Sequence, residues 1–328
     1  MNTFAPPAFL RILDRKLLRD LWGMKGQALA IAFVIAGGVA VQLVADGMLS
    51  SFSETRRAYY ERYRFADVWA PVVRAPNVLI GEIRAIPGVI AAETRVRAPA
   101  LIDMPGMAEP ASGEIFSLPD VGEPSVNQVY LARGRTPQLD GPNEAVVLET
   151  FAEAHGLEIG DSVQATVYGG RKRLEIVGIG LSPEHVYAIA PGQLVPDARL
   201  FGVFWMGRNA LAQSVNQDGA FTEAVVRLAP GVEEAPVIEA LDRLLEPYGS
   251  PGAYGREEQI SDAFVSGEID QLDIMGSILP PIFLLVAAFL VNVVISRLIA
   301  TERSEIGLMK AFGYRDRDVV VHYLKLVG

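Results

Sequence analysis

The chain has 328 residues, 50% of them hydrophobic, and a net charge of −10. The absence of cysteine excludes disulfide bonds, thiolate metal sites and cysteine nucleophiles, and the acidic balance argues against nucleic acid as a partner. The sequence contains neither a G-x-x-x-x-G-K-[ST] phosphate loop nor a G-x-S-x-G elbow, so we expect no catalytic residue, no bound cofactor and no metal site.

The first 25 residues predict a basic amphipathic helix. Leu10, Leu13, Leu17 and Leu21 line one side of it and Trp22 follows them, whereas the basic residues fall elsewhere. Such a helix is suited to the inner surface of a membrane. We therefore expect residues 1–25 to lie in the cytoplasm against the lipid.

Two apolar runs, within 26–46 and 274–296, are each about 20 residues long, which is the length a helix needs to cross a bilayer. A cleaved signal peptide is the alternative for the first run, but that run lacks a clean A-x-A cleavage site. We expect two transmembrane helices.

The distribution of charge predicts their orientation. Lys and Arg exceed Asp and Glu by three in residues 1–27 and by two in residues 297–328, whereas residues 49–273 carry a net charge of −14. Because cytoplasmic loops carry an excess of Lys and Arg, both ends should be cytoplasmic. Residues 47–273 should then form a domain outside the cytoplasm.

The first predicted span carries a row of small residues. Ala28, Ala32, Ala36 and Ala40 recur every four residues, a spacing that lets another helix approach closely in lipid. Asn292, near the inner end of the second span, is expected to hydrogen-bond to a neighbouring helix. These five residues predict contacts with further membrane helices or further copies of this chain.

Residues 47–273 predict an α+β fold. Two β-α-β units, at 65–104 and 221–256, flank a mostly β insert at about 115–206, so the α+β part is discontinuous in sequence. Within the insert, two strands joined by Gly169-Gly170 predict a β-hairpin. His155 and His185 lack obvious metal ligands nearby and are interpreted as surface or hydrogen-bonded histidines.

The last segment, 297–328, predicts a helix from 297 to about 312 that ends at Gly313. Ile299, Ile306 and Met309 share one face of this helix, as expected for docking on another protein. The chain becomes apolar again over 319–327, which we interpret as the start of a third membrane helix that is cut off.

The stretch ERSEIGLMKAFGYRDRDVVVHYL resembles the intracellular segment of FtsX-like permeases of ABC transporters. The matching residues are Glu302, Arg303, Glu305, Ile306, Gly307, Lys310, Ala311 and Gly313. The middle of the chain is similar to the MacB-like periplasmic core domain, with a G-R-x-P phrase at 134–137 and a G-L-x-x-G-D phrase at 156–161.

This resemblance implies a permease subunit in the inner (cell) membrane of a bacterium. The matched cytoplasmic residues would contact a separate ABC ATPase subunit, which uses the ATP. Hydrolysis would move the outer domain, which handles a substrate such as a lipid, lipoprotein or peptide. The alternative is a transmembrane signalling or scaffold subunit that activates an extracytoplasmic protein such as a cell-wall hydrolase. In either case membrane lipid surrounds the spans.

Overall fold

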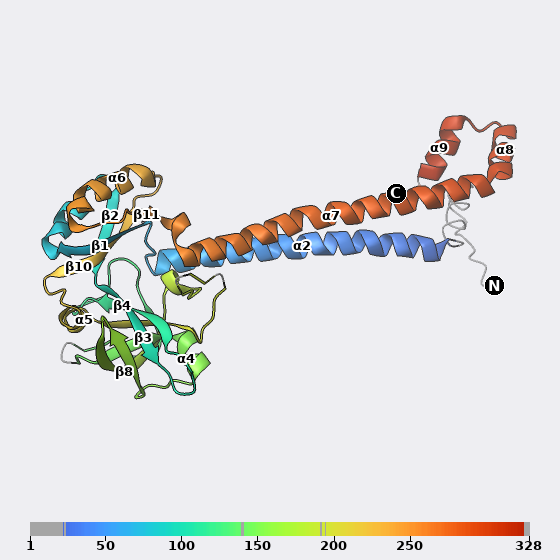
Figure 1. Cartoon of the computed structure of the whole chain (residues 1–328). Helices are drawn as coiled ribbons and strands as arrows, with labels where there is room; N and C mark the ends of the chain where they lie inside the picture. Colours follow the sequence, from blue (N-terminus) through green and yellow to red (C-terminus); the bar gives the residue numbers. More distant parts are fainter. Residues whose placement is uncertain (1–21, 23, 139–140, 191, 194, 325–328) are drawn as a thin grey trace. The chain divides into compact units, whose positions relative to one another are not determined.

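A computed structural model describes residues 22, 24–138, 141–190, 192–193 and 195–324 (Figure 1). The chain divides into two compact units. The sheet unit is Ser53–Glu268, and the helical unit combines Met1–Phe52 with Ile269–Gly328. Most of the predicted amphipathic helix at 1–25 lies outside the described residues.

Two long helices, α2 (Lys25–Arg62) and α7 (Ile260–Thr301), contain the predicted apolar runs. Both are long and apolar enough to cross a membrane, with mean hydropathies of 2.4 and 2.7 over their most apolar windows. As the absence of Gly and Pro after Met48 predicts, α2 continues beyond its apolar part. Two short helices, α8 (Arg303–Ala311) and α9 (Asp316–Leu324), follow α7.

Within the helical unit, α2 and α7 approach each other at glycine residues. Gly38 is buried, and a Cβ atom there would lie 2.8 Å from the Cβ of Phe283. A Cβ atom at Gly276 would lie 3.0 Å from the Cβ of Ala45. Small residues allow this close approach, and van der Waals packing is what drives helix association in lipid.

Three of the four residues in the predicted alanine row are exposed. Ala32, Ala36 and Ala40 are exposed, Ala28 is half-buried, and Asn292 on α7 is exposed as well. Packing of a further helix against these residues stays a prediction.

The sheet unit contains a four-stranded sheet of order β11-β1-β10-β2, in which all neighbours are antiparallel. Its strands are β1 (Val68–Pro76), β2 (Val89–Arg95), β10 (Ala220–Leu228) and β11 (Tyr254–Gly255). The short 3₁₀ helix η1 (Asn77–Leu79) and α3 (Ile80–Arg84) connect β1 to β2, whereas α6 (Glu234–Leu245) and the 3₁₀ helix η3 (Glu246–Tyr248) connect β10 to β11. Apolar residues of α3 and α6, including Ile83, Val237 and Leu241, pack on one face of the sheet.

Both predicted β-α-β units are present, but they are interleaved. β10 lies between β1 and β2, and β1 lies between β10 and β11. Neither unit therefore pairs its own two strands, and each depends on the other to complete the sheet. This arrangement corresponds to the split β-α-β architecture.

The second sheet has the order β5-β8-β6-β9-β4-β3-β7, and β7 also pairs with β8. Its strands are β3 (Arg97–Asp103), β4 (Ala111–Leu118), β5 (Tyr130–Gly134), β6 (Glu144–Leu148), β7 (Ser162–Val167), β8 (Gly170–Leu181) and β9 (Phe201–Gly207). The β7–β8 pairing closes six of these strands into a barrel, which removes exposed sheet edges. Helices α4 (Glu149–His155) and α5 (Arg208–Ser214) follow β6 and β9.

The predicted α+β class and the predicted hairpin are confirmed, since Thr166 of β7 pairs with Arg171 of β8. The β insert was expected at 115–206, whereas the strands of the barrel begin at Arg97. Only Val96 separates β2 of the first sheet from β3 of the barrel. No Gly, Pro, Asn or Asp occurs at residues 95–97, so no turn signal marks the change of sheet.

The two phrases that resemble the MacB-like domain contain glycines whose backbone conformation few other residues adopt. Gly134 has φ +84°, and a Cβ atom there would clash with the carbonyl oxygen of Val177 in β8. Gly156 ends α4 with φ +65°, and Asp161 Oδ2 accepts a hydrogen bond from the backbone N–H of Glu158 at 2.8 Å. Glycine tolerates these conformations, so both phrases hold turns of the barrel in place.

Candidate functional site

The first candidate site is the predicted cytoplasmic segment, which the structure divides into two helices. α7 ends at Thr301 and α8 begins at Arg303, because Glu302 has a non-helical backbone (φ −97°, ψ 17°). The hydroxyl of Thr301 bonds to the carbonyl oxygens of Arg297 and Leu298, which favours a bend here. The single helix expected from 297 to 312 is thus wrong, although the chain turns at Gly313 (φ +89°) as predicted.

α8 has one face packed inward and another exposed. Ile306 and Met309 pack against buried Leu298 and Val319. Leu308 and Phe312 are 58% and 76% exposed. Of the expected face, only Ile299 is exposed, at 42%. The apolar side chains of α8 available to a partner are therefore Leu308 and Phe312, rather than Ile306 and Met309.

The residues that match FtsX-like permeases lie together on α8 and at its two ends. Glu302 precedes the helix, whereas Arg303, Glu305, Gly307, Lys310 and Ala311 are exposed on it and Gly313 follows it. Lys310 Nζ lies 2.7 Å from Asp316 Oδ1, so an exposed ion pair joins α8 to α9. A role for these residues in ATPase contact stays a prediction.

The second candidate site is a buried ionic network in the sheet unit, which the sequence did not predict. Arg95 of β2 donates from Nε to Glu223 of β10 at 2.6 Å, and its terminal nitrogens donate to both carboxylate oxygens of Glu184. Arg97 of β3 reaches Glu114 at 2.6 Å and Glu223 at 3.1 Å. The network thus joins the four-stranded sheet, the barrel and the 3₁₀ helix η2 (Pro183–His185).

Burial and ion pairing have opposite effects on the pKa of Glu184. Burial works to raise the pKa of Glu184, but the charge and hydrogen bonds of Arg95 outweigh it and hold that pKa at about 2. Trp69 adds a hydrogen bond from Nε1 to Glu184 Oε1 at 2.6 Å. Glu184 therefore remains ionised although its side chain is only 5% exposed.

His185 lies beside this network and, unlike Glu184, is held in its neutral form at neutral pH. Burial lowers its pKa to about 4, with Arg95 and Arg97 lowering it further against the attraction of Glu184. Among the described residues, no hydrogen-bond partner is found for its buried Nε2. His185 is thus half-buried, with one ring nitrogen unpaired in the described part of the chain, and it is not the fully hydrogen-bonded histidine that was expected. His155 does have a partner, since its Nε2 lies 3.0 Å from the carbonyl oxygen of Arg199.

We expect acid to destabilise the sheet unit through His185. The unfolded chain takes up this proton near pH 6.5, whereas the folded protein does so only near pH 4. Stability is thus fully present above pH 6.5 and falls as the pH drops toward 4, by up to about 3 kcal/mol. Glu184, with its lowered pKa of about 2, extends the loss to lower pH.

The measurement is urea unfolding of the full chain and of a His185→Gln variant at several pH values. The variant should lose the part of the pH dependence between pH 6.5 and 4 and keep the part below it. Identical pH profiles for the two proteins would contradict this role of His185.

The network also contacts the start of α7 inside the sheet unit. Gln259 Nε2 donates to the carbonyl oxygen of Glu184 at 2.8 Å, and the backbone N–H of Tyr187 donates to Ser261 Oγ at 2.9 Å. Tyr60 of α2 donates to Asp262 of α7 at 2.7 Å. Within this unit, the end of α2 and the start of α7 are thus connected to each other, and the start of α7 is also connected to the segment that follows β8.

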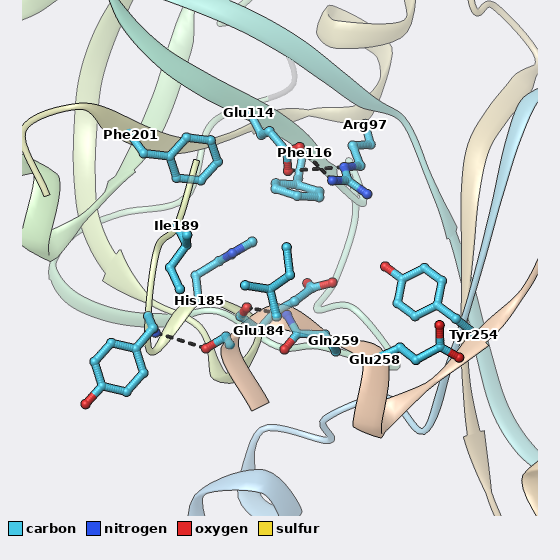
Figure 2. Close-up of a pocket in the computed structure, with 13 residues that line it drawn as sticks. Arg97, Glu114, Phe116, Glu184, His185, Ile189, Phe201, Tyr254, Glu258 and Gln259 are labelled. Carbon is cyan, nitrogen blue, oxygen red and sulfur yellow. Dashed lines mark hydrogen bonds and ion pairs between the residues drawn. The ribbon is translucent and has the colours of Figure 1, made fainter. Parts of the chain in front are cut away.

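A cavity of about 260 Å³ opens beside these residues (Figure 2). Its lining combines Arg97 and Glu114 from the network with aromatic residues such as Phe116, Phe201 and Tyr254. The members of the network lie far apart in sequence, Arg95 being 89 residues from Glu184 and 128 from Glu223. The one local signal was a charged residue, Arg95 or Glu223, within an otherwise strand-like segment.

Comparison with known proteins gives two matches to family models. The model of the MacB-like periplasmic core domain matches residues 24–244, and that of the FtsX-like permease C-terminal matches residues 277–327. No curated protein matches the sequence.

Several solved structures are similar. The extracellular domain of the noncanonic ABC-type transporter YknZ from Gram-positive bacteria is 11% identical, and the match covers 58% of this chain and 98% of that one with a TM-score of 0.36. The periplasmic region of MacB from Actinobacillus actinomycetemcomitans is 9% identical, with 64% and 95% covered and a TM-score of 0.37. A domain of a putative permease protein from Porphyromonas gingivalis is 16% identical, with 57% and 84% covered and a TM-score of 0.31. At these TM-scores the similarities carry no argument about function.

Proposed function

Because the chain belongs to the FtsX/MacB-like family of ABC transporter permeases, we propose that it couples ATP hydrolysis by a separate ATPase subunit to movement of its sheet unit. Members of this family work with ABC ATPase partners, and the chain is a membrane-embedded permease with a periplasmic domain. We propose further that both ends are cytoplasmic and that the membrane is the inner membrane of a bacterium, as the charge distribution favours.

The proposal depends mainly on α8, which has one face packed against its neighbours and another face exposed. Ile306 and Met309 hold the helix against Leu298 and Val319, so a force applied to α8 acts on its neighbours as well. Leu308 and Phe312 remain exposed among charged residues. An exposed aromatic side chain within a charged surround is typical of the centre of a protein interface.

The two long helices support the transmission of movement. Both α2 and α7 are continuous from their apolar windows into segments of the sheet unit. There, Tyr60 of α2 and Asp262 of α7 share a buried hydrogen bond, and Arg56 donates to Ser266 at 2.8 Å.

We propose that the sheet unit handles a lipid, lipoprotein or peptide, which is the class that the family resemblance implies. The exposed alanines of α2 (Ala32, Ala36 and Ala40), with the half-buried Ala28, and Asn292 of α7 would then contact further permease copies or further membrane helices. Such contacts would cover residues that would otherwise face lipid.

The test uses the full chain in lipid nanodiscs together with its partner ABC ATPase. Leu308→Asp and Phe312→Asp should each reduce copurification of the ATPase by about 30-fold or more, because each places a charge at the apolar centre of the contact. Charge reversal at Glu302, Glu305 and Lys310 should likewise uncouple ATP hydrolysis without unfolding the sheet unit.

Tyr168→Asp is the matched control, since Tyr168 is 67% exposed at a hairpin tip of the sheet unit. This control should bind the ATPase normally, and circular dichroism should show that all variants are folded. Unchanged ATPase binding and stimulation in the α8 variants would overturn the proposed coupling.

A further inference from the structure

The cavity beside the ionic network lies entirely within the sheet unit (Figure 2). The figure shows Phe201 and Ile189 at the left, Tyr254 and Glu258 at the right, and the Arg97–Glu114 pair above. Its volume is about 260 Å³, whereas a cavity of about 150 Å³ is enough to bind benzene. The space therefore fits one aromatic ring with a short chain.

The network along the wall of this cavity has an unequal number of charges. Its ion pairs connect two guanidinium groups, Arg95 and Arg97, to three carboxylates. The carboxylates are those of Glu114, Glu184 and Glu223, whose side chains are 12%, 5% and 0% exposed. One buried negative charge is thus not balanced inside the network.

A buried charge without a counter-charge is costly. His185 also lines the cavity, but burial lowers its pKa and keeps it neutral at neutral pH, so it supplies no positive charge. Arg97 offers little to an added anion, because its nitrogens already donate to Glu114 and Glu223. The electrostatic environment of the cavity thus favours a cation.

The rest of the lining favours an organic cation over a hydrated ion. Phe201 and Tyr254 present aromatic rings, and Ile189 and Ile260 add aliphatic surface. The ring of Phe116 already carries the guanidinium group of Arg95 at 4.5 Å. Aromatic faces attract ammonium groups, and this attraction strengthens when the cation loses water. Glu258, an exposed residue that lines the cavity, contributes a second negative charge.

We propose that this cavity binds a small organic cation, namely an amine attached to an apolar body of about one aromatic ring. The ammonium group lies toward Glu258 and the negatively charged network, and the apolar body lies against Phe201 and Ile189. The binding concerns the sheet unit and does not depend on ATPase coupling.

The test is ligand-observed NMR on the full chain in a neutral maltoside detergent. The probes are phenethylamine, 2-phenylethanol and 3-phenylpropionate, which present a similar ring and chain with a positive, neutral or negative end. Phenethylamine should bind with a Kd of about 1 mM. It should bind about tenfold more tightly than the alcohol, and the carboxylate should not bind.

Two neighbouring carboxylates provide a matched pair of variants. Glu258→Gln should weaken phenethylamine binding about fivefold or more and leave the alcohol unaffected. Glu257→Gln removes a charge that is also exposed but lines a different cavity, and it should leave both ligands unaffected.

Three results would overturn the proposal. Equal binding of the amine and the alcohol would indicate a purely apolar cavity, and stronger binding of the carboxylate would indicate an anion site. Absence of amine binding up to about 10 mM would exclude a ligand site of this kind.

Discussion

Replacing Arg95 with leucine is expected to destabilise the sheet unit by about 3–5 kcal/mol. The change would leave Glu184 without its charged partner and Glu223 with only the longer contact to Arg97, and the side chains of both carboxylates are almost fully buried. It would also remove the guanidinium group that lies 4.5 Å from the ring centre of Phe116. Urea unfolding of the full chain, followed by tryptophan fluorescence, measures the loss, because Trp69 hydrogen-bonds to Glu184.

Arg243→Leu is the matched control for this substitution. Arg243 forms an ion pair of 3.8 Å with Glu239 on α6, where both side chains are 73% exposed. Solvent screens such a pair, so we expect little change in stability. Equal unfolding midpoints for the Arg95 and Arg243 variants would show that the buried network does not hold the sheet unit together.

Replacing Phe204 with alanine is expected to destabilise the barrel by about 3–5 kcal/mol. Phe204 is fully buried on β9, and its ring packs edge-to-face on that of Phe151 of α4, with the ring centres 5.7 Å apart. Truncation would leave a cavity in an interior formed by strands that pair with one another around the barrel. These strands are not free to move inward, so the cavity would remain largely unfilled.

The same unfolding assay tests this prediction, with Tyr168→Ala as the control. Tyr168 is exposed at the tip of the β7–β8 hairpin, so its truncation should change stability little. A loss below about 1 kcal/mol for the Phe204 variant would contradict a closely packed barrel interior.

Part of the fold was predictable because it depends on neighbouring residues. The apolar windows of α2 and α7 follow from composition alone. The β7–β8 hairpin follows from two strand-forming runs joined by Gly169-Gly170. Each of the two β-α-β units was also found, since Pro-Gly turns mark the helix and strand boundaries.

The pairing of these units was not predictable, because it depends on contacts between distant segments. Val68 of β1 pairs with Val226 of β10, and Ala92 of β2 pairs with the same residue on its other side. The register of such pairs is selected by the burial of whole strand faces. The barrel closes for the same reason, through pairing of β3 with β7 that local patterns do not reveal.

The α8 site was likewise predictable only in part. The α8 segment was found as a stretch of sequence, since its charged and small residues follow one another along the chain. The exposed face of α8 could not be found in this way. It depends on Leu298 and Val319, against which Ile306 and Met309 pack.

Amino-acid order alone was thus enough for the two apolar helices, their charged flanks, the α+β class and the family resemblance, since each depends on composition or on short-range spacing. Folding in three dimensions added the interleaved sheet, the closed barrel, the face of α8 and the network of Arg95, Glu184 and Glu223. These features arise from residues far apart in the chain. The cost of burying a charge is offset only when its distant partners are buried with it.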